Sequence, residues 1–428
     1  MKNTEYFKGK QVTVVGIARS GLMCARLLHD IGARVSVTDR QDTPLTRANA
    51  AALKERGIEV ELGRHSESFV DGRQLLVVSP GVTAENPCIC RAEENGTPVI
   101  AEIEVGWLLC PATVIAITGS SGKTTVTTLI GSIITAAGKR AFVCGNIGTP
   151  FCQEVPRMQE EDYVSLEVSS FQLERIRAFK PRIALILNLS RNHLDRHRDM
   201  QEYLDAKNRI FMNQDEQDHL VLNADDPALA GCASAARSKK AYFSSAGWAN
   251  PNYAAAAAVG KILGIGDGLM REVFAGFKGI EHRMEEVARV NGVTFINDSK
   301  ATTAESANWA LRSIPGRIVL IAGGRDKGVD YGVIAEEARK KVKEVILIGE
   351  AKAAIARALQ GVAPIREAAT LPEAVEKAFL GAQAGEYVLL SPMCSSFDMF
   401  CDFEERGRVF KQAVHGLSGK EKGSSAVR

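Results

Sequence analysis

The 428-residue sequence has almost no excess of charge, since its 53 Lys and Arg residues face 51 Asp and Glu residues. A chain without a strong overall field is not drawn to nucleic acid or to an anionic membrane, so any phosphate binding must be local. No run approaches the roughly 20 apolar residues that span a bilayer. The opening residues, MKNTEYFKGK, lack the apolar stretch of a signal peptide. We therefore expect a cytoplasmic protein with no membrane or nucleic-acid partner.

Cysteine also lacks an organised pattern in this sequence. The nine cysteines are scattered, and the closest pair, Cys88 and Cys90, has one residue between its members rather than two. This spacing argues against a zinc or disulfide framework and favours reduced, mostly buried thiols. The length and the ordinary composition, 45% hydrophobic and 24% charged, predict roughly three folded domains rather than a small stapled scaffold.

The sequence does contain a repeated alternation of short apolar strands and helical stretches, which is typical of an α/β fold. The alternation restarts near residue 110 and again after residue 280. We expect a Rossmann-like N-terminal domain (1–106), a central P-loop ATPase domain with a mostly parallel sheet (107–280) and a Rossmann-like C-terminal domain (281–428). The last residues are small, polar and charged, which predicts a frayed tail.

The strongest local motif, TGSSGKTT at residues 118–125, lies between an apolar strand and a helix. In such a loop the backbone N–H groups and the helix N-terminus hold phosphates, the lysine reaches the terminal phosphates and the hydroxyl binds Mg²⁺. The full pattern would have glycine at Ile117, so the match rests on the GKT core and its context. The motif predicts ATP or GTP binding by a set of adjacent residues: Gly119, Ser120, Ser121, Gly122, Lys123, Thr124 and Thr125.

A second glycine-rich turn follows the first predicted strand and runs from Gly16 to Gly21. The next strand ends at Asp39, an acid that could accept hydrogen bonds from a ribose or a base. Because Ala18 replaces the middle glycine, a nucleotide site and a purely structural turn remain equally open. A turn at residues 79–81, SPG, ends another strand and would line the same ligand crevice.

Glu167 and His193 come at strand ends of the central segment, and with the Thr124 hydroxyl they could hold Mg²⁺. His193 and His197 lie four residues apart, a spacing that also suits zinc. No third ligand of matching type is nearby in the sequence, so we favour Mg²⁺.

The remaining candidates are lysine-bearing segments. Lys207 lies on a predicted helix, where its position alone indicates a solvated charge. In the third segment, NDSK at 297–300 and GGRDK at 323–327 each follow a strand. A turn with an exposed lysine is the ordinary structure for either one. Two such clusters at strand ends nevertheless favour a binding site.

Taken together, these motifs resemble the Mur ligase family of ATP-dependent amide-forming enzymes, from about residue 10 to residue 415. The strings EVSSFQLE, NDSKAT and the C-terminal SSFDMF with FEERG favour D-glutamate as the amino acid that is added. The resemblance rests on an ordered set of strings: SPG (79–81), TGSSGKTT (118–125), GNIG (145–148), LEVSSFQLE (166–174), NADD (223–226), HR (282–283), NDSKAT (297–302), GGRDK (323–327), SPMCSSFDMF (391–400) and FEERG (403–407).

The resemblance implies that ATP phosphorylates the terminal carboxylate of UDP-N-acetylmuramoyl-L-alanine and that D-glutamate attacks the acyl phosphate, releasing ADP and phosphate. It implies a first domain for the UDP substrate, a central domain for ATP and a third domain for the amino acid, in a monomer that serves peptidoglycan synthesis. A carboxylate is a poor electrophile until its oxygen becomes a phosphate leaving group, and Mg²⁺ and lysine offset the repulsion between the two anions.

The resemblance also implies a role for each candidate residue. Lys123 would stabilise the ATP phosphates. Thr124, Glu167 and His193 would surround Mg²⁺. Lys207 would be carbamylated, which turns a cation into a carboxylate ligand for a second Mg²⁺. The nucleotide would also meet Asn252, Arg283 and Asp298. D-glutamate would lie among Lys300, Thr302, Lys327, Ser396 and Phe403. The sugar nucleotide would meet Ala18, Arg19, Ser20, Asp39, Ser79 and Asn146.

Four positions depart from the family pattern. Ser121 and Thr303 stand where asparagine is expected, and Asn192 stands where an acid is common. Ala255 replaces an asparagine whose amide would lie near the adenine. Because the charged residues are intact, we expect an altered affinity for ATP rather than lost chemistry.

Three alternatives remain open from the sequence. A sister ligase for another amino acid, or a folylpolyglutamate-type synthetase, would use the same chemistry. An NAD-dependent hydride transfer would use the first glycine-rich turn. A non-enzymatic, nucleotide-regulated binding module would keep the phosphate loop but would have no need for the lysines of the third segment.

Overall fold

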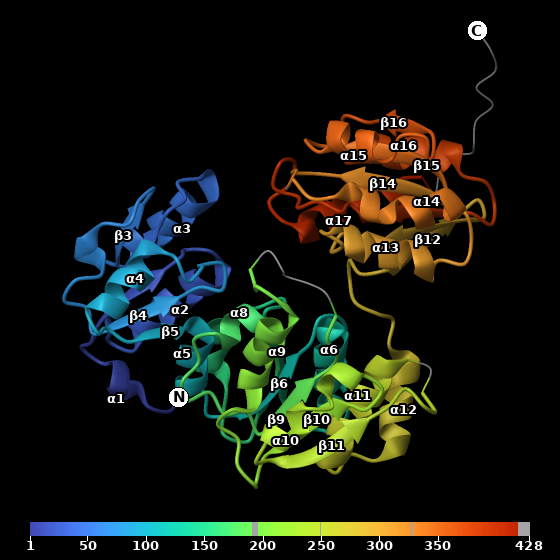
Figure 1. Cartoon of the computed structure of the whole chain (residues 1–428). Coiled ribbons are helices and arrows are strands. Elements are labelled where there is room, and N and C mark those ends of the chain that lie inside the picture. The colour runs from blue at the N-terminus through green and yellow to red at the C-terminus, as the bar shows by residue number, and fades with distance from the viewer. Residues whose placement is uncertain (191–195, 249, 327, 418–428) are drawn as a thin grey trace. The chain divides into compact units, whose positions relative to one another are not determined.

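The computed structural model describes residues 1–190, 196–248, 250–326 and 328–417. It forms two compact units, Met1–Phe277 and Lys278–Arg428. The first unit contains two β-sheets and the second contains one, and helices connect the strands of each (Figure 1). The chain therefore has the three-domain α/β architecture that the sequence predicts. The domain limits at residues 106 and 280 remain predictions.

The first sheet is fully parallel, with the strand order β3-β2-β1-β4-β5. Its central strands β1 and β4 are buried on both faces, which explains their uninterrupted apolar sequences. The strands are β1 (Gln11–Val15), β2 (Arg34–Asp39), β3 (Glu59–Leu62), β4 (Leu75–Val78) and β5 (Val99–Ala101). The helices are α1 (Thr4–Phe7), α2 (Arg19–Asp30), α3 (Pro44–Lys54), η1 (Glu67–Phe69), α4 (Pro87–Glu94) and α5 (Glu102–Leu109).

The central sheet is also parallel, with the order β11-β10-β9-β6-β8-β7. Its strands are β6 (Thr113–Thr118), β7 (Ala141–Gly145), β8 (Tyr163–Glu167), β9 (Ile183–Ile186), β10 (His219–Asn223) and β11 (Lys239–Phe243). Its helices are α6 (Lys123–Ala136), α7 (Phe151–Glu154), η2 (Val155–Arg157), α8 (Ser170–Leu173), α9 (Met200–Asn208), η3 (Arg209–Phe211), η4 (Pro227–Leu229), α10 (Cys232–Ala235), α11 (Pro251–Ile262) and α12 (Asp267–Gly276).

The sheet of the second unit has the order β12-β13-β17-β14-β15-β16, and only its edge strand β12 is antiparallel. Its strands are β12 (Glu285–Val290), β13 (Val293–Asn297), β14 (Ile318–Gly323), β15 (Val342–Ile348), β16 (Ile365–Glu367) and β17 (Tyr387–Leu390). Its helices are α13 (Ala304–Ser313), η5 (Tyr331–Ile334), α14 (Ala335–Lys341), α15 (Lys352–Ala358), α16 (Leu371–Gly381) and α17 (Phe403–His415).

The strands that sequence patterning did not identify are mostly short or lie at sheet edges. β11 carries two lysines and is exposed along much of its length, and β16 has only three residues, Ile365–Glu367. An edge strand needs only part of one face buried, so it shows no continuous apolar run. The buried central strands follow the alternation of apolar segments that the sequence shows.

The structure bears on two features that the sequence lacks, a cysteine framework and long apolar runs. All nine cysteines are free thiols, and only Cys90 and Cys401 are exposed, as the sequence predicts. Within the described parts of the chain, no helix combines the length and the apolar character that crossing a membrane requires.

Helix α5 follows the last strand of the first sheet and carries two buried carboxylates. Glu104 accepts hydrogen bonds from the backbone N–H groups of residues 177–179, at 2.6–3.1 Å, and so attaches α5 to the central sheet's connections. Glu102 accepts a hydrogen bond from Gln172 Nε2 at 2.8 Å, but its Oε2 is buried without a partner among the described residues. Burial raises the pKa of Glu102 to about 7. Glu102 is therefore largely protonated below that pH.

We predict that Glu102→Gln removes a pH dependence of stability. In the wild type the folded state holds the Glu102 proton more tightly than the unfolded state, so its contribution is complete below pH 4.5 and is lost as the pH rises through about 7. Relative to the variant, the wild type should lose about 1.4 kcal/mol of unfolding free energy per pH unit across this window. Urea unfolding at several pH values measures the difference. Glu160→Gln, at an exposed position, is the control, and parallel curves for wild type and Glu102→Gln would contradict the prediction.

Candidate active site

The glycine-rich turn of the first sheet lies where the strand order reverses, between β1 and β4. Parallel sheets bind ligands at such a point, outside the carboxyl ends of the strands. Ser79, directly after β4, donates a hydrogen bond from Oγ to the Gly16 carbonyl oxygen at 3.1 Å. A Cβ atom at Gly21 would collide with that same carbonyl oxygen, so only glycine fits there. Ala18 caps α2, and Arg19 and Ser20 begin it. The structure therefore brings Ser79 to the turn.

Asp39 holds the same turn in shape. Its Oδ2 accepts from the Ile17 N–H and its Oδ1 from the Gln41 N–H, both at 2.8 Å. Asp39 thus has a structural role that its position at a strand end did not reveal. Contact of Asp39 with a uracil or ribose remains a prediction.

The phosphate loop connects β6 to α6 at the equivalent reversal of the central sheet, between β6 and β9. Gly119 and Gly122 have φ values of +153° and +80°, in the region that favours glycine. Lys123 Nζ donates to the carbonyl oxygens of Gly119 and Ser120 at 2.9 and 3.1 Å. The loop and the first turn of α6, which contains Thr125, thus adopt the arrangement that the motif predicts.

Asn188, just beyond β9, closes the phosphate loop and was not singled out in the sequence. Its Oδ1 accepts from the N–H groups of Ser120 and Ser121 at 3.1 and 2.9 Å, and its Nδ2 donates to the Ser121 carbonyl oxygen at 3.1 Å. The only sequence signal was a polar residue at the end of a buried strand. Ser121, one of the departures from the family pattern, meets Asn188 mainly through its backbone.

Thr124 and Glu167 form the core of the candidate Mg²⁺ site. Thr124 Oγ1 donates to Glu167 Oε2 at 2.8 Å, and the buried Glu167 also accepts from Asn146 Nδ2 at 3.1 Å. Asn146 therefore lies with the metal candidates, whereas the family resemblance implies a contact with the sugar nucleotide. Hydroxyl and carboxylate oxygens suit Mg²⁺, so these residues fit that ion.

The spacing in the sequence suggests that His193 and His197 form a pair of ligands. His193 lies outside the described residues. His197 is buried, its Nε2 lies 3.0 Å from Ser170 Oγ, and its ring stacks on Phe171. Burial lowers its pKa, which favours the neutral ring. Among the residues that the structure describes, no three His, Cys, Asp or Glu side chains cluster as a metal site.

The position of Lys207 on a helix indicated a solvated surface charge. The structure contradicts this interpretation. Lys207 is 1% exposed, its Nζ donates to the Gly119 carbonyl oxygen at 3.0 Å and lies 4.2 Å from the centroid of the Tyr203 ring. Burial, with the positive charge of Lys123 as a second cause, lowers its pKa well below the usual range. Tertiary packing thus places a buried amine beside the phosphate loop.

At the start of α11, Asn252 also lies against the phosphate loop. A Cβ atom added to Gly122 would come within 2.5 Å of Asn252 Oδ1. Ala255, in contrast, is fully buried in the hydrophobic core. An asparagine at 255 would face apolar side chains in this structure. The effect of the missing amide on adenine binding remains a prediction.

In the second unit, Asp298 lies buried at the end of β13. Ser391 Oγ donates to its Oδ2 at 3.0 Å, and the Met284 N–H donates to its Oδ1 at 3.3 Å. Burial raises the pKa of Asp298 to about 7, while the positive charge of Arg283 acts in the opposite direction. The structure therefore brings Asp298 and Arg283 together. Thr303, another departure, caps helix α13 through its hydroxyl.

Of the residues predicted to hold D-glutamate, Lys300 and Thr302 follow β13, Ser396 follows β17 and Phe403 begins α17. Lys300 Nζ lies 5.8 Å from the centroid of the Phe403 ring. The Thr302 N–H donates to the Lys300 carbonyl oxygen. Ser396 is buried, and its carbonyl oxygen accepts hydrogen bonds from the N–H groups of residues 399 and 400. Lys327 lies outside the described residues.

Arg406, within the FEERG string, organises this region and was not predicted as a site residue. It is fully buried, its Nε and Nη2 donate to Oγ and O of Ser299, and its Nη1 donates to the Cys394 carbonyl oxygen, at 2.8–3.1 Å. It thereby ties the segment after β13 to the segment after β17. An isolated arginine in a polar helix gives no sequence signal for such burial.

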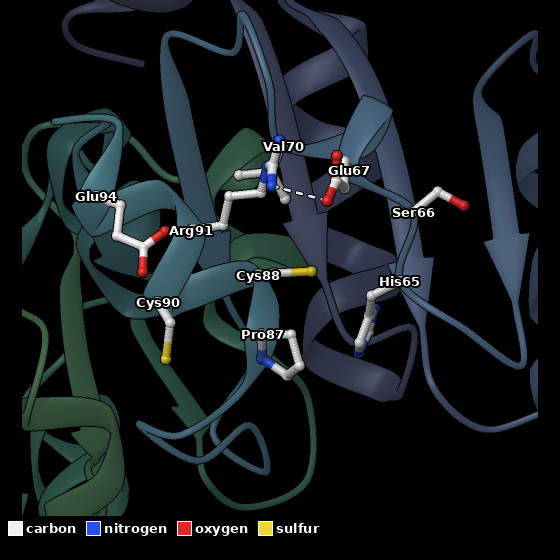
Figure 2. Close-up of a pocket in the computed structure, with 9 residues that line it drawn as sticks. All are labelled: His65, Ser66, Glu67, Val70, Pro87, Cys88, Cys90, Arg91 and Glu94. Carbon is white, nitrogen blue, oxygen red and sulfur yellow. Dashed lines mark ion pairs between the residues drawn. The ribbon is translucent and has the colours of Figure 1, made fainter.

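A groove of about 300 Å³ lies between η1 and α4 and contains none of the predicted site residues (Figure 2). The cation at its edge, Arg91, is already paired with Glu67 at 2.9 Å and with Asp71 at 2.6 Å. Cys88 faces the groove, and burial raises the pKa of its thiol to about 11, which makes it a poor nucleophile. The groove therefore carries no catalytic arrangement.

Three models of protein-family domains match this chain. Residues 10–101 match the model of the Mur ligase MurD-like N-terminal domain, residues 117–264 the Mur ligase middle domain, and residues 282–394 the Mur ligase glutamate ligase domain. The chain belongs to the Mur ligase family. As a member, it is an ATP-dependent ligase of peptidoglycan precursor synthesis.

Similar Mur ligases include two named UDP-N-acetylmuramoylalanine--D-glutamate ligase. The protein of Geobacter metallireducens is 41% identical, over 97% of this chain and 99% of its own length, and that of Geotalea daltonii is 40% identical, over 96% and 98%. The UDP-N-acetylmuramate-alanine ligase of Thermotoga maritima has a similar structure, with a TM-score of 0.59, 19% identity and coverage of 95% and 99%. This last similarity concerns the fold alone.

We predict that Gly122→Ala weakens ATP binding by about tenfold or more, because the new methyl group would displace the loop from Asn252. Gly138→Ala is a matched control at the other end of α6. Gly138 has a φ of +77° but open space around an added Cβ, so this variant shares the backbone strain without the collision. Calorimetric titration with ATP measures both. Equal affinities in the two variants would show that the collision is harmless.

Proposed function

We propose that the chain joins D-glutamate to UDP-N-acetylmuramoyl-L-alanine with hydrolysis of ATP to ADP and phosphate. The observation that supports the chemistry is the Thr124–Glu167 contact beside the phosphate loop, because hydroxyl and carboxylate oxygens are ligands that suit Mg²⁺. The choice of D-glutamate is supported by the relatives named UDP-N-acetylmuramoylalanine--D-glutamate ligase, which match almost the full chain.

In the proposed reaction the terminal alanine carboxylate attacks the γ-phosphorus of ATP, and ADP leaves. The amine of D-glutamate then attacks the carbonyl carbon of the acyl phosphate, loses a proton, and the resulting tetrahedral intermediate expels phosphate to leave an amide. The first step brings the carboxylate anion against the phosphate anions of ATP. Positive charge at the phosphates therefore lowers the activation barrier of this step.

Lys123 would supply part of this charge once it leaves its present carbonyl partners for the γ-phosphate. Thr124 and Glu167, with His193, would hold Mg²⁺, which when bound acts as a Lewis acid on the phosphoryl oxygens. Asn252, Arg283 and Asp298 would position the rest of the nucleotide. Its ribose hydroxyls are suitable donors to the Asp298 carboxyl group.

Lys207 would act as a carbamate. Its low pKa favours the neutral amine, which adds to CO₂ and releases a proton. The product carries a negative charge, which the positive charge of Lys123 attracts, whereas a protonated Lys207 would be repelled by it. The carbamate oxygens would be ligands for a second Mg²⁺ ion.

The substrates would bind at the two remaining sheets. The glycine-rich turn at Ala18, Arg19 and Ser20 would meet the diphosphate of the UDP substrate, with Ser79 and Asp39 nearby. D-glutamate carboxylates would pair with Lys300 and Lys327, beside Thr302, Ser396 and Phe403. A monomeric state and a cytoplasmic location remain predictions from the sequence.

The sharpest test is phosphate release from ATP and Mg²⁺ in the presence of UDP-N-acetylmuramoyl-L-alanine. We expect release to require D-glutamate and to be absent with L-glutamate, L-lysine or no amino acid. Release with L-lysine instead would identify a sister ligase. Release without any amino acid would contradict the ligase reaction.

A second prediction concerns Lys207. We expect Lys207→Ala to lower kcat by at least about 10²-fold, since a metal ligand is lost, and a small added carboxylate such as acetate to restore part of the rate. Lys261→Ala, at an exposed lysine, should behave as the wild type. Steady-state phosphate release measures all three proteins, and a near-normal rate for Lys207→Ala would refute the carbamate.

A further inference from the structure

Arg196 joins the first sheet to the central sheet, although no sequence motif marked it. Its Nη1 donates to the Pro80 carbonyl oxygen at 2.9 Å, and its Nη2 donates to the Val82 carbonyl oxygen at 3.0 Å. Nη2 also donates to Glu174 Oε2 at 3.0 Å. The side chain is only 15% exposed, and its guanidinium carbon lies 4.2 Å from the centroid of the Phe171 ring. Arg196 is therefore held on both sides.

On the side of the first sheet, Arg196 contacts the turn that follows β4. Ser79 belongs to this turn, since the Val82 N–H donates to its carbonyl oxygen at 3.0 Å. The Ser79 hydroxyl in turn binds the Gly16 carbonyl oxygen. Three hydrogen bonds in series therefore connect Arg196 to the glycine-rich turn.

On the side of the central sheet, the contacts lead to the phosphate loop. Phe171, which stacks on the Arg196 guanidinium, also stacks on His197. The His197 ring lies 5.1 Å from the Tyr203 ring, which is in contact with Lys207. Tyr203 OH also lies 3.4 Å from Ser120 Oγ, within the loop itself.

We infer that Arg196 is a positioning residue for the ligase reaction, an inference that rests on the proposed function. It sets the distance between the turn that binds the sugar nucleotide and the loop that binds ATP. The attacking carboxylate and the γ-phosphate belong to substrates held by different sheets, and a displacement of about 1 Å between reacting groups can cost about 10²-fold in rate.

The guanidinium group suits this role better than an ammonium group. Its planar fork reaches two carbonyl oxygens and one carboxylate at the same time, in fixed directions. Lysine keeps the charge but has a single nitrogen on a flexible stem. The conservative variant Arg196→Lys therefore separates geometry from charge.

The experiment compares wild type, Arg196→Lys and Arg198→Lys. Arg198 is a matched control two residues away, 86% exposed and paired only with Glu202 among the contacts that the structure describes. Calorimetry gives Kd for UDP-N-acetylmuramoyl-L-alanine and for ATP, steady-state assays give kcat, and a thermal melt gives Tm.

For Arg196→Lys we expect Kd for the UDP substrate to rise about tenfold and kcat to fall about tenfold or more, with Kd for ATP and Tm as in the control. Unchanged Kd and kcat would overturn the inference. An equal loss of affinity for ATP together with a lower Tm would also overturn it, because that result would indicate a general structural role. Phosphate release by the wild type tests the proposed function separately, because the two Kd values need no turnover.

Discussion

The carbonyl oxygen of Gly119 accepts hydrogen bonds from both Lys123 and Lys207, so two amino groups converge on one buried point. Burial away from water lowers the pKa of Lys207, and the positive charge of Lys123 lowers it further. The arrangement is relieved when negative charge arrives. The phosphates of ATP supply such charge, and in the proposed function a carbamate at Lys207 would add to it.

The same constraint explains why so many neighbouring groups hold the loop. Asn188 fixes its backbone, Asn252 leaves room only for glycine at 122, and the Thr124–Glu167 contact sets the depth of the first turn of α6. The first sheet repeats the principle with other residues, since Asp39 and Ser79 hold the glycine-rich turn. In both sheets, side chains from adjacent strand ends hold the glycine-rich loop in shape.

The second unit places charge differently, in two buried groups, an arginine and an aspartate. Arg406 is buried and bonded to neutral oxygens, and burial lowers its pKa to about 10. Asp298, also buried, has its pKa raised to about 7. Such groups are costly to bury, and they are tolerated where they hold together the ends of strands that form a binding site.

The sequence by itself determined the α/β class, the central strands, the phosphate loop and the order of the motifs, because these depend on local periodicity and on residues adjacent along the chain. The family resemblance followed from the same strings. Residue spacing alone did not predict the burial of Lys207, the clamps made by Asn188 and Arg406, or the bridging contacts of Arg196. It also left open that Asp39 supports its own turn and that Ala255 belongs to the core. Those features exist only when strands far apart in the sequence end side by side, since burial and hydrogen-bond partners are properties of the packed structure.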